Sequence, residues 1–317
     1  MSADVTIDTS TRESTSSAVN RDLHGIATLA PDLTSRPART PWQIAVARFR
    51  RSKLALLGLL LITVMTLVAV FADVIAPYGE NEIDLFNITA KPSAEHVLGT
   101  DELGRDELSR LMFGARISLL VGVGAALIST AVGIFVGSLA GYYGGWVDSA
   151  LMRFVDVILA FPAIFLLLIF FSIQGSSVLT VIVFLGLFSW MWLARVIRGE
   201  FLSLKQRDFI EAARSIGVPD GRLMWRHLLP NVGAAIIVST TLTIAYSMLS
   251  EATLSFLGFG VPPGTPTWGN MLNAARPNYI QVPVLAIAPG LTLTIAVLAI
   301  NFVGDGLRDA LDPRGRG

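Results

Sequence analysis

"FIEAARSIGVPDGRLMWRHLLPNV", from Phe209 to Val232, is a mixed-charge segment in a chain that is otherwise strongly apolar. It belongs to a polar stretch, 195–230, that lies between two apolar runs. Its apolar residues recur at helical spacing as far as Ile216. Gly217 then suits the left-handed position that ends a helix, and Pro219 can start the next one. The segment therefore predicts two short helices that meet at an elbow.

The composition of the chain predicts a membrane protein. Of its 317 residues, 53% are hydrophobic and 15% are charged, whereas a soluble domain usually carries about 25% charge. The formal net charge of +0 gives no support to nucleic-acid binding. The chain has no cysteine, which excludes disulfides and thiolate metal sites.

Six apolar stretches are each about long enough to cross a bilayer as a helix. They cover residues 54–76, 117–140, 154–173, 178–195, 232–257 and 282–303. The third and fourth share one uncharged run, 157–194, which is too long for a single crossing, so a turn is expected at Ser172–Ser177. The predicted fold class is an all-α membrane protein with six transmembrane helices. The alternative, a set of buried helices in a soluble core, would need amphipathic partner helices that the sequence lacks.

The basic residues near the spans set the orientation of the chain. Seventeen of them flank the spans on one side, and five lie in loops 77–116 and 259–281 on the other. Both termini are therefore predicted to be cytoplasmic. The predicted parts are a disordered cytoplasmic tail at 1–40, an interfacial helix with the first span at 41–76, an extracytoplasmic loop at 77–116, a five-helix core at 117–303 with a cytoplasmic loop at 196–230, and a cytoplasmic tail at 304–317. The interfacial helix is expected from Trp42 to Lys53, where apolar and basic residues are mixed. The alternative is that this segment is a plain juxtamembrane anchor.

Two of the spans carry features that affect helix packing. In the second span, small residues recur at every fourth position, at Ser129, Gly133, Gly137 and Gly141. This spacing lets another helix approach closely, either within the bundle or from a second membrane subunit. In the third span, Pro162 removes a helix hydrogen bond and predicts a kink.

The fifth span carries a row of hydroxyl groups. The row consists of Ser239, Thr243, Tyr246, Ser247 and Ser250, which are spaced to share one face of a helix. Because lipid offers hydroxyl groups no partners, the row should face protein or a water-filled path. We predict that Ser239, Thr243, Tyr246 and Ser247 line a translocation path. The alternative is a packing role, in which the hydroxyls bond back to their own helix.

Ionisable side chains that could support catalysis are scarce in the spans. Glu251, near the outer end of the fifth, is either a functional buried carboxylate or a solvated group at the membrane rim. The histidines, His24, His96 and His227, all lie outside the spans, which excludes an intramembrane Ser/His or zinc protease. No lysine follows a glycine, so the chain has no phosphate-binding loop. We therefore predict that the chain is no enzyme and holds no metal or cofactor, and that any ATPase is another subunit.

The opening segment resembles the EAA loop of ATP-binding-cassette (ABC) importer permeases. That loop has the pattern Glu-Ala-Ala, three residues, Gly, nine residues, and Ile-x-Leu-Pro. The matching residues here are Glu211, Ala212, Ala213, Gly217, Leu229 and Pro230. His227 stands in the place of the isoleucine, and Leu228 can supply an apolar contact beside it. The resemblance implies that the matching residues couple the chain to an ATPase subunit, with the loop around Glu211 and Gly217 sitting in a cleft of that subunit as the coupling helix.

Three further stretches resemble the C-type permeases of dipeptide and oligopeptide importers. They are "HVLGTDELGRDELSRLMFGARISLLVG" (96–122), "SEATLSFLGFGVPPGTPTWGNML" (250–272) and "NFVGDGLRDALDPR" (301–314). The resemblance implies a permease like those of type I ABC importers, in the cytoplasmic (inner) membrane of a bacterium. The partners it implies are a second permease, ATPase subunits that carry ATP and Mg²⁺, an external binding protein that meets loops 77–116 and 259–281, and a peptide substrate.

Two other functions are weighed against a peptide importer. A self-contained secondary transporter would show paired charges or broken helices within its spans and inverted repeats between its halves. The sequence shows neither feature. Members of the same permease family also carry nickel chelates and other small solutes, and the selectivity of such importers lies largely in the external binding protein.

Overall fold

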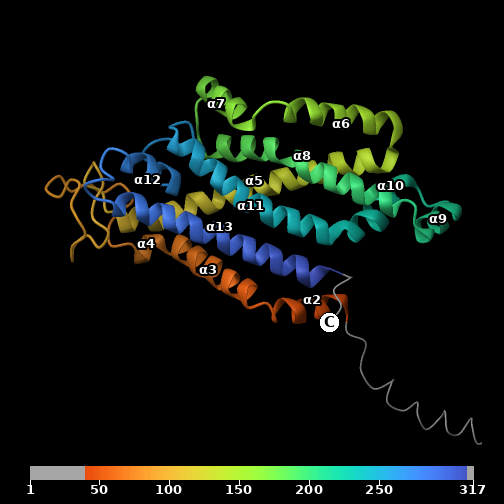
Figure 1. Cartoon of the computed structure of the whole chain (residues 1–317), viewed down its shortest axis with the longest axis horizontal. Coiled ribbons are helices and arrows are strands. Elements are labelled where there is room, and N and C mark those ends of the chain that lie inside the picture. The colour runs from red at the N-terminus through yellow and green to blue at the C-terminus, as the bar shows by residue number, and fades with distance from the viewer. Residues whose placement is uncertain (1–39, 313–317) are drawn as a thin grey trace, which may run out of the picture. The chain divides into compact units, whose positions relative to one another are not determined.

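The computed structural model describes residues 40–312 of the chain (Figure 1). The predicted disordered tail at 1–40 lies outside the described residues except for Thr40, and so does 313–317 of the second predicted tail. The chain divides into two units, 1–44 and 45–317. The arrangement described below is that of the second unit.

The described part of the chain is built of α-helices. The helices are α2 (Pro41–Phe49), α3 (Lys53–Val70), α4 (Ala72–Ile75), α5 (Glu107–Tyr143), α6 (Gly145–Leu159), α7 (Ala163–Gln174), α8 (Val178–Leu204), α9 (Asp208–Ser215), α10 (Asp220–Arg222), α11 (Gly233–Phe256), α12 (Trp268–Ala275) and α13 (Val284–Leu311). Five helical stretches are long and apolar enough to cross a membrane, or six if α6 and α7 together form one broken span. The prediction of an all-α membrane fold is confirmed, and the sixth span depends on that bent pair.

The third predicted span, 154–173, is not one kinked helix. α6 and α7 meet at 78° across a break that contains Pro162. Pro162 has no N–H to continue the helical ladder, so the chain starts a new helix directly after it. The ion pairs that hold α6 along α8 are Arg198–Asp148 and Arg195–Asp156. These long-range pairs fix the direction of α6, which explains why the turn is far larger than a proline kink.

The row of small residues in α5 packs directly against α8. A Cβ atom at Gly137 would lie 2.6 Å from the carbonyl oxygen of Ala194, and one at Gly141 would lie 2.6 Å from Cβ of Phe201. Larger side chains at these positions would therefore hold the two helices apart. Of the two alternatives that the sequence leaves open for this row, the structure supports packing within the bundle.

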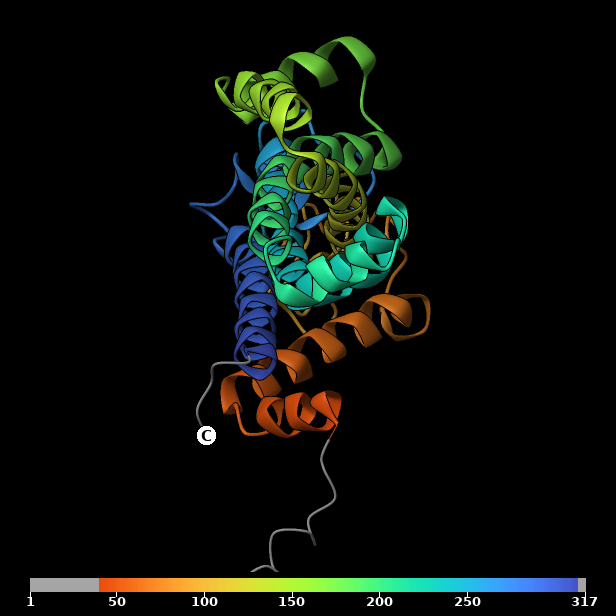
Figure 2. The ribbon, with the colours of Figure 1, turned by 90° about the vertical axis from the view of Figure 1, so that its right-hand side faces the viewer.

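A second close helix pair is formed by α3 and α13, which lie side by side (Figure 1). A Cβ atom at Gly58 would lie 2.4 Å from the carbonyl oxygen of Ala299, and one at Gly306 would lie 2.3 Å from Cβ of Ala55. α11 contacts both α13 and α5 and so joins the two pairs. Figure 2 shows the bundle from the end that holds α9 and α10.

The polar segments lie at two opposite ends of the helices in Figure 1. α9 and α10 lie at one end, and α12 lies at the other with the loop before α5. Several boundaries differ from the predicted ones. α5 begins at Glu107, inside the predicted loop 77–116, α8 continues past 195 to Leu204, inside the predicted loop 196–230, and α13 continues past 303 to Leu311. The separation of the two ends agrees with the predicted orientation, although the membrane side of each end stays a prediction.

Candidate functional site

α9 presents one exposed face at the end of the bundle. Glu211, Ala212 and Arg214 are exposed, and the side chain of Ile216, directly after α9, is 82% exposed. Ile210, on the opposite face, is completely buried. The helix is therefore amphipathic. No described residue of the chain covers its outer face, so a partner protein can contact it.

The inner face of α9 rests on an apolar cluster at the ends of α5 and α8, which we call the elbow core. The elbow core consists of Tyr142, Leu193, Ile197, Phe201, Ile210, Ala213, Leu223, Met224, Leu228 and Val232. Complete burial of one Leu, Ile or Phe side chain contributes about 1.5–3 kcal/mol. The predicted coupling residue Ala213 belongs to this buried face, whereas Glu211 and Ala212 belong to the exposed one. The elbow is thus anchored to α5 and α8.

The end of α9 is a Schellman motif centred on Gly217. The N–H of Val218 donates to the carbonyl of Ala213 (3.2 Å), and the N–H of Gly217 donates to that of Arg214 (3.0 Å). Gly217 has φ of +82°, which residues with a side chain rarely adopt. No described atom outside the adjoining residues lies within 4 Å of where its Cβ would be. The backbone angle alone therefore requires glycine, and the prediction that Gly217 ends the helix is confirmed.

The second helix of the predicted elbow is not short, so that part of the prediction is wrong. From Asp220 one helical stretch runs through α10, a π-helical turn (η1, Leu223–Leu228) and a 3-10 turn (η2, Leu229–Val232) into α11. Pro219 caps this stretch from outside, with an extended ψ of 148°. The buried positions of η1 and η2 all face the elbow core, so the apolar pattern continues into the span without a break. α9 is therefore connected to α11 through a continuous helix.

Pro230 lies inside this continuous helix. It has no N–H to donate, and its ring would clash with the carbonyl one turn earlier. The π-helical turn before it and the 3-10 turn around it relieve this conflict. The side-chain amide of Asn231 donates to the carbonyl of His227 at 2.6 Å, a contact that the sequence analysis missed. Of the last two predicted coupling residues, Pro230 is exposed and Leu229 is half-buried.

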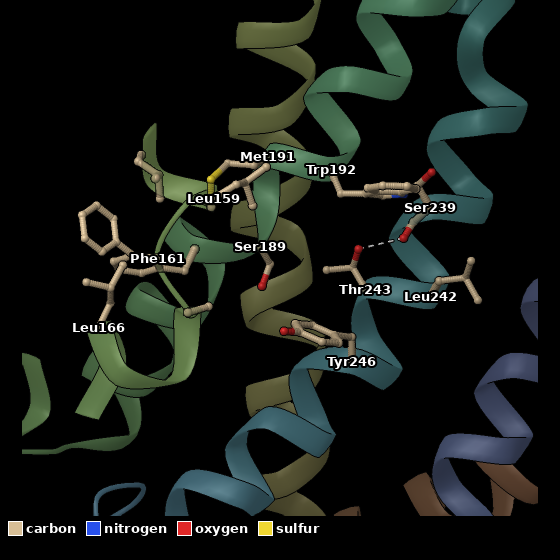
Figure 3. Close-up of a pocket in the computed structure, with 13 residues that line it drawn as sticks. Leu159, Phe161, Leu166, Ser189, Met191, Trp192, Ser239, Leu242, Thr243 and Tyr246 are labelled. Carbon is tan, nitrogen blue, oxygen red and sulfur yellow. Dashed lines mark hydrogen bonds between the residues drawn. The ribbon is translucent and has the colours of Figure 1, made fainter. Parts of the chain in front are cut away.

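A pocket of about 320 Å³ lies between α8, α11 and the α6–α7 break (Figure 3). Three of the predicted path residues line it, and Ser189 and Trp192 of α8 face them. The residues that line the pocket are Ile158, Leu159, Phe161, Ala163, Leu166, Phe188, Ser189, Met191, Trp192, Ser239, Leu242, Thr243 and Tyr246. The lining contains hydroxyl groups and aromatic rings but no charged side chain among these residues.

The fourth predicted path residue, Ser247, lies outside the pocket. Its side chain is completely buried, and its hydroxyl has no hydrogen-bond partner among the described residues. An α-helix turns by about 100° per residue, so each four-residue step drifts by about 40°. The row from Ser239 through Thr243 thus moves away from the pocket by Ser247. Thr243 also donates a hydrogen bond to the carbonyl of Ser239 (2.8 Å), which the packing alternative predicts.

Glu251 is not a solvated group at the rim. Its side chain is completely buried, and the Ser255 hydroxyl donates to Oε1 at 2.7 Å. The Ser255 oxygen in turn accepts the N–H of Val261 at 3.1 Å. The carboxylate therefore holds the loop between α11 and α12 through Ser255, and the pocket lining does not include it.

Buried polar and charged side chains fix the loop before α5, and the sequence analysis missed their pairing. Nδ1 of His96 lies 2.9 Å from Oδ1 of Asp106, which also caps α5. Arg105 pairs with Asp101 at 2.7 Å. These pairs form inside a loop that has no periodic pattern, so the sequence offers no signal for them. Across residues 40–312, no group of three or more His, Cys, Asp or Glu side chains could hold a metal ion.

Two family models match the chain. Residues 133–317 match the binding-protein-dependent transport system inner membrane component, and residues 40–92 match the N-terminal TM domain of oligopeptide transport permease C. Together these matches cover the chain from the last part of α5 onward and the segment around α2 and α3. The resemblance to C-type ABC importer permeases is therefore confirmed.

Curated relatives and a solved structure agree with this assignment. The glutathione transport system permease protein GsiD of Escherichia coli O6:K15:H31 (strain 536 / UPEC) is 45% identical over 280 residues, which cover 88% of this chain and 92% of the relative. GsiD of Shigella boydii serotype 4 (strain Sb227) gives the same values. An inward-facing structure of the MetNI methionine ABC transporter matches with a TM-score of 0.53 at 20% identity, over 64% of this chain and 96% of that one. The chain belongs to the family of binding-protein-dependent transport system inner membrane components, the multi-pass permeases of bacterial ABC importers.

Proposed function

We propose that this chain is one of two permease subunits in an ATP-driven importer of short peptides. The glutathione assignment of its relatives and the match to oligopeptide transport permease C both support a peptide substrate. Import of nickel chelates or other small solutes is the alternative within the same family. No observation on the described residues favours that alternative.

The observation that carries the proposal is the anchored, half-exposed helix α9. Its outer face is open, while its inner face is held in the elbow core. After Gly217 the chain continues without a break from Asp220 into α11, which lines the pocket. An ATPase subunit that moves α9 would therefore move a pocket-lining span as well. Alternating access follows when such a displacement reorients the spans around a central path.

The predicted coupling residues have separate roles in this proposal. Glu211 and Ala212 contact the ATPase subunit, whereas Ala213 and Leu229 hold the elbow in place. Gly217 sets the angle between α9 and the helical stretch that begins at Asp220. Pro230 marks the point where the regular helix that leads to α11 is interrupted. ATP and Mg²⁺ bind to the ATPase subunits, because the sequence contains no phosphate-binding loop.

The pocket is proposed to form this subunit's half of the path. Ser239, Thr243 and Tyr246 offer hydroxyl groups beside apolar surface, and the second permease supplies the other half. A lining without charge binds a peptide weakly, and weak binding lets a transported solute leave again. Selectivity then rests with an extracytoplasmic binding protein, which meets the end of the bundle that holds α12 and the loop before α5.

Substitution of Gly217 tests this proposal. Gly217→Pro cannot adopt φ of +82° and loses the hydrogen bond to Arg214, so we expect uptake of radiolabelled glutathione or dialanine to be abolished in cells. The amount of chain in the membrane should stay the same. Gly221→Ala is the control, because it lies in a helical turn with open space around it, and it should import normally. Normal uptake by Gly217→Pro would refute the coupling role.

A further inference from the structure

Tyr142, in the last turn of α5, contacts both the end of α8 and the start of α10. Its hydroxyl donates a hydrogen bond to Oδ1 of Asp220, at the start of α10. Its carbonyl accepts a hydrogen bond from Nζ of Lys205, directly after α8, at 2.6 Å. The same Nζ lies 5.6 Å from the centre of the Tyr142 ring, within range of a cation–π contact. Through its side chain and its carbonyl, this one residue thus connects the ends of α5 and α8 to the start of α10.

The environment of Tyr142 favours this role over simple packing. The residue is only 3% exposed, and its ring belongs to the elbow core. A buried phenol needs a partner for its hydroxyl, and the partner here is a carboxylate, which strengthens the hydrogen bond. The bond joins residues that are 78 positions apart in the chain. It is therefore a contact between separate segments of the elbow.

Tyr142 belongs mechanically to the α5–α8 pair. Gly137 and Gly141 let α5 pack against α8 at a distance too short for a Cβ atom, so the two helices form a closely packed pair. Lys205 adds a polar contact at the same end by satisfying a carbonyl in the last turn of α5. The hydrogen bond to Asp220 therefore attaches the elbow to a rigid pair of helices.

The other connection of the elbow, to α11, is weaker along its length. The helix from Asp220 passes through η1 and η2, where the regular ladder of hydrogen bonds is replaced by π and 3-10 turns around Pro230. Helices bend most readily at such irregular turns. The elbow thus has one stiff attachment, through the elbow core and the Tyr142 hydroxyl, and one that can bend, through residues 223–232.

We propose that Tyr142 is a positioning residue that locks the elbow to the α5–α8 pair, so that a displaced elbow turns these two helices while α11 bends at residues 223–232. This inference rests on the proposed coupling function. It assigns the transmission of movement to a tyrosine hydroxyl outside the EAA loop. Loss of the hydroxyl should therefore loosen the link between the elbow and the α5–α8 pair, so that less of the elbow's movement reaches these two helices.

The test is the ratio of peptides imported to ATP molecules hydrolysed by the complete complex in proteoliposomes. Tyr142→Phe removes the hydroxyl and keeps the ring in the elbow core. We expect ATP hydrolysis to continue while import per ATP falls about tenfold, as loss of a hydrogen bond to a charged group implies. Tyr143→Phe is the matched control, because Tyr143 is adjacent and 51% exposed, and its ratio should not change.

A second variant keeps the test decisive if Tyr142→Phe does not assemble. Asp220→Ala breaks the same bond from the exposed side. It should lower the ratio like Tyr142→Phe, and the double variant should fall no further than either single one. An unchanged ratio in both single variants, alongside lost import in Gly217→Pro, would overturn the role of Tyr142 and leave the proposed function standing. Normal import in Gly217→Pro would overturn the proposed function itself.

Discussion

The carboxylate of Glu251 accepts a hydrogen bond from the hydroxyl of Ser255, one helical turn away, at 2.7 Å and without exposure to solvent. Ser255 accepts the N–H of Val261 in turn, so a buried acid in α11 positions the loop that leads to α12. An ionisable group at such a place in a membrane protein commonly has a function. Here the geometry indicates that the Glu251 side chain positions the loop between α11 and α12.

This relationship predicts different effects for two substitutions of Glu251. Glu251→Gln keeps an oxygen that can accept the Ser255 hydroxyl, so import and loop order should stay close to those of the unaltered protein. Glu251→Leu leaves the Ser255 hydroxyl without its acceptor and should lower the free energy of unfolding by about 1–3 kcal/mol. Limited proteolysis of residues 257–267 in the purified complex measures the difference. Equal protection of the loop in both variants would contradict the positioning role.

The contact between α5 and α8 predicts that Gly137→Ala destabilises the protein. The new Cβ would lie 2.6 Å from the carbonyl oxygen of Ala194, and main-chain atoms cannot move aside as a flexible side chain can. We expect the free energy of unfolding to fall by about 1–3 kcal/mol, which is measured as a lower Tm of the complex in detergent. Gly199→Ala in α8 is the control, since it points into open space and should leave Tm unchanged or raise it. A Tm for Gly137→Ala as high as that of the control would show that the helices do not pack as described.

The pocket predicts which positions of α11 are accessible to water. Because the chain has no cysteine, single cysteines can be introduced without altering another thiol. A small water-soluble maleimide should label Ser239→Cys and Tyr246→Cys in the assembled complex and should not label Ser247→Cys. Labelling of Ser247→Cys at the same rate would show that the path follows the whole row of hydroxyl groups. Protection of all three would support the packing alternative.

Much of the fold can be predicted from the sequence, because its signals are local. Apolar runs of about 20 residues identify the spans, and Gly217 indicates the end of α9 through a backbone angle that only glycine adopts easily. Pro162 predicts a kink in the third span for an equally local reason, and the structure has a full break there. In each case the signal lies within the segment whose structure it determines.

The features that the sequence analysis missed depend on contacts between distant segments. The 78° turn between α6 and α7 accompanies ion pairs with α8, and the drift of Ser247 out of the pocket shows only when the whole helix is placed. The stretch from Asp220 continues into α11 because its buried side chains share the elbow core with α8. The bond between Tyr142 and Asp220 joins residues whose proximity has no local signal.

The most direct test of the coupling role of α9 compares cysteines at two adjacent positions, Ala212 and Ala213. Ala212 is exposed on the outer face of α9, and Ala213 is buried in the elbow core. Each cysteine variant is expressed with its partner subunits in native membranes and treated with a short photoactivatable thiol reagent. We expect Ala212→Cys to cross-link to an ATPase subunit and Ala213→Cys to give no such product. If import is intact and neither position cross-links, or if both do so equally, α9 does not dock its outer face on the ATPase.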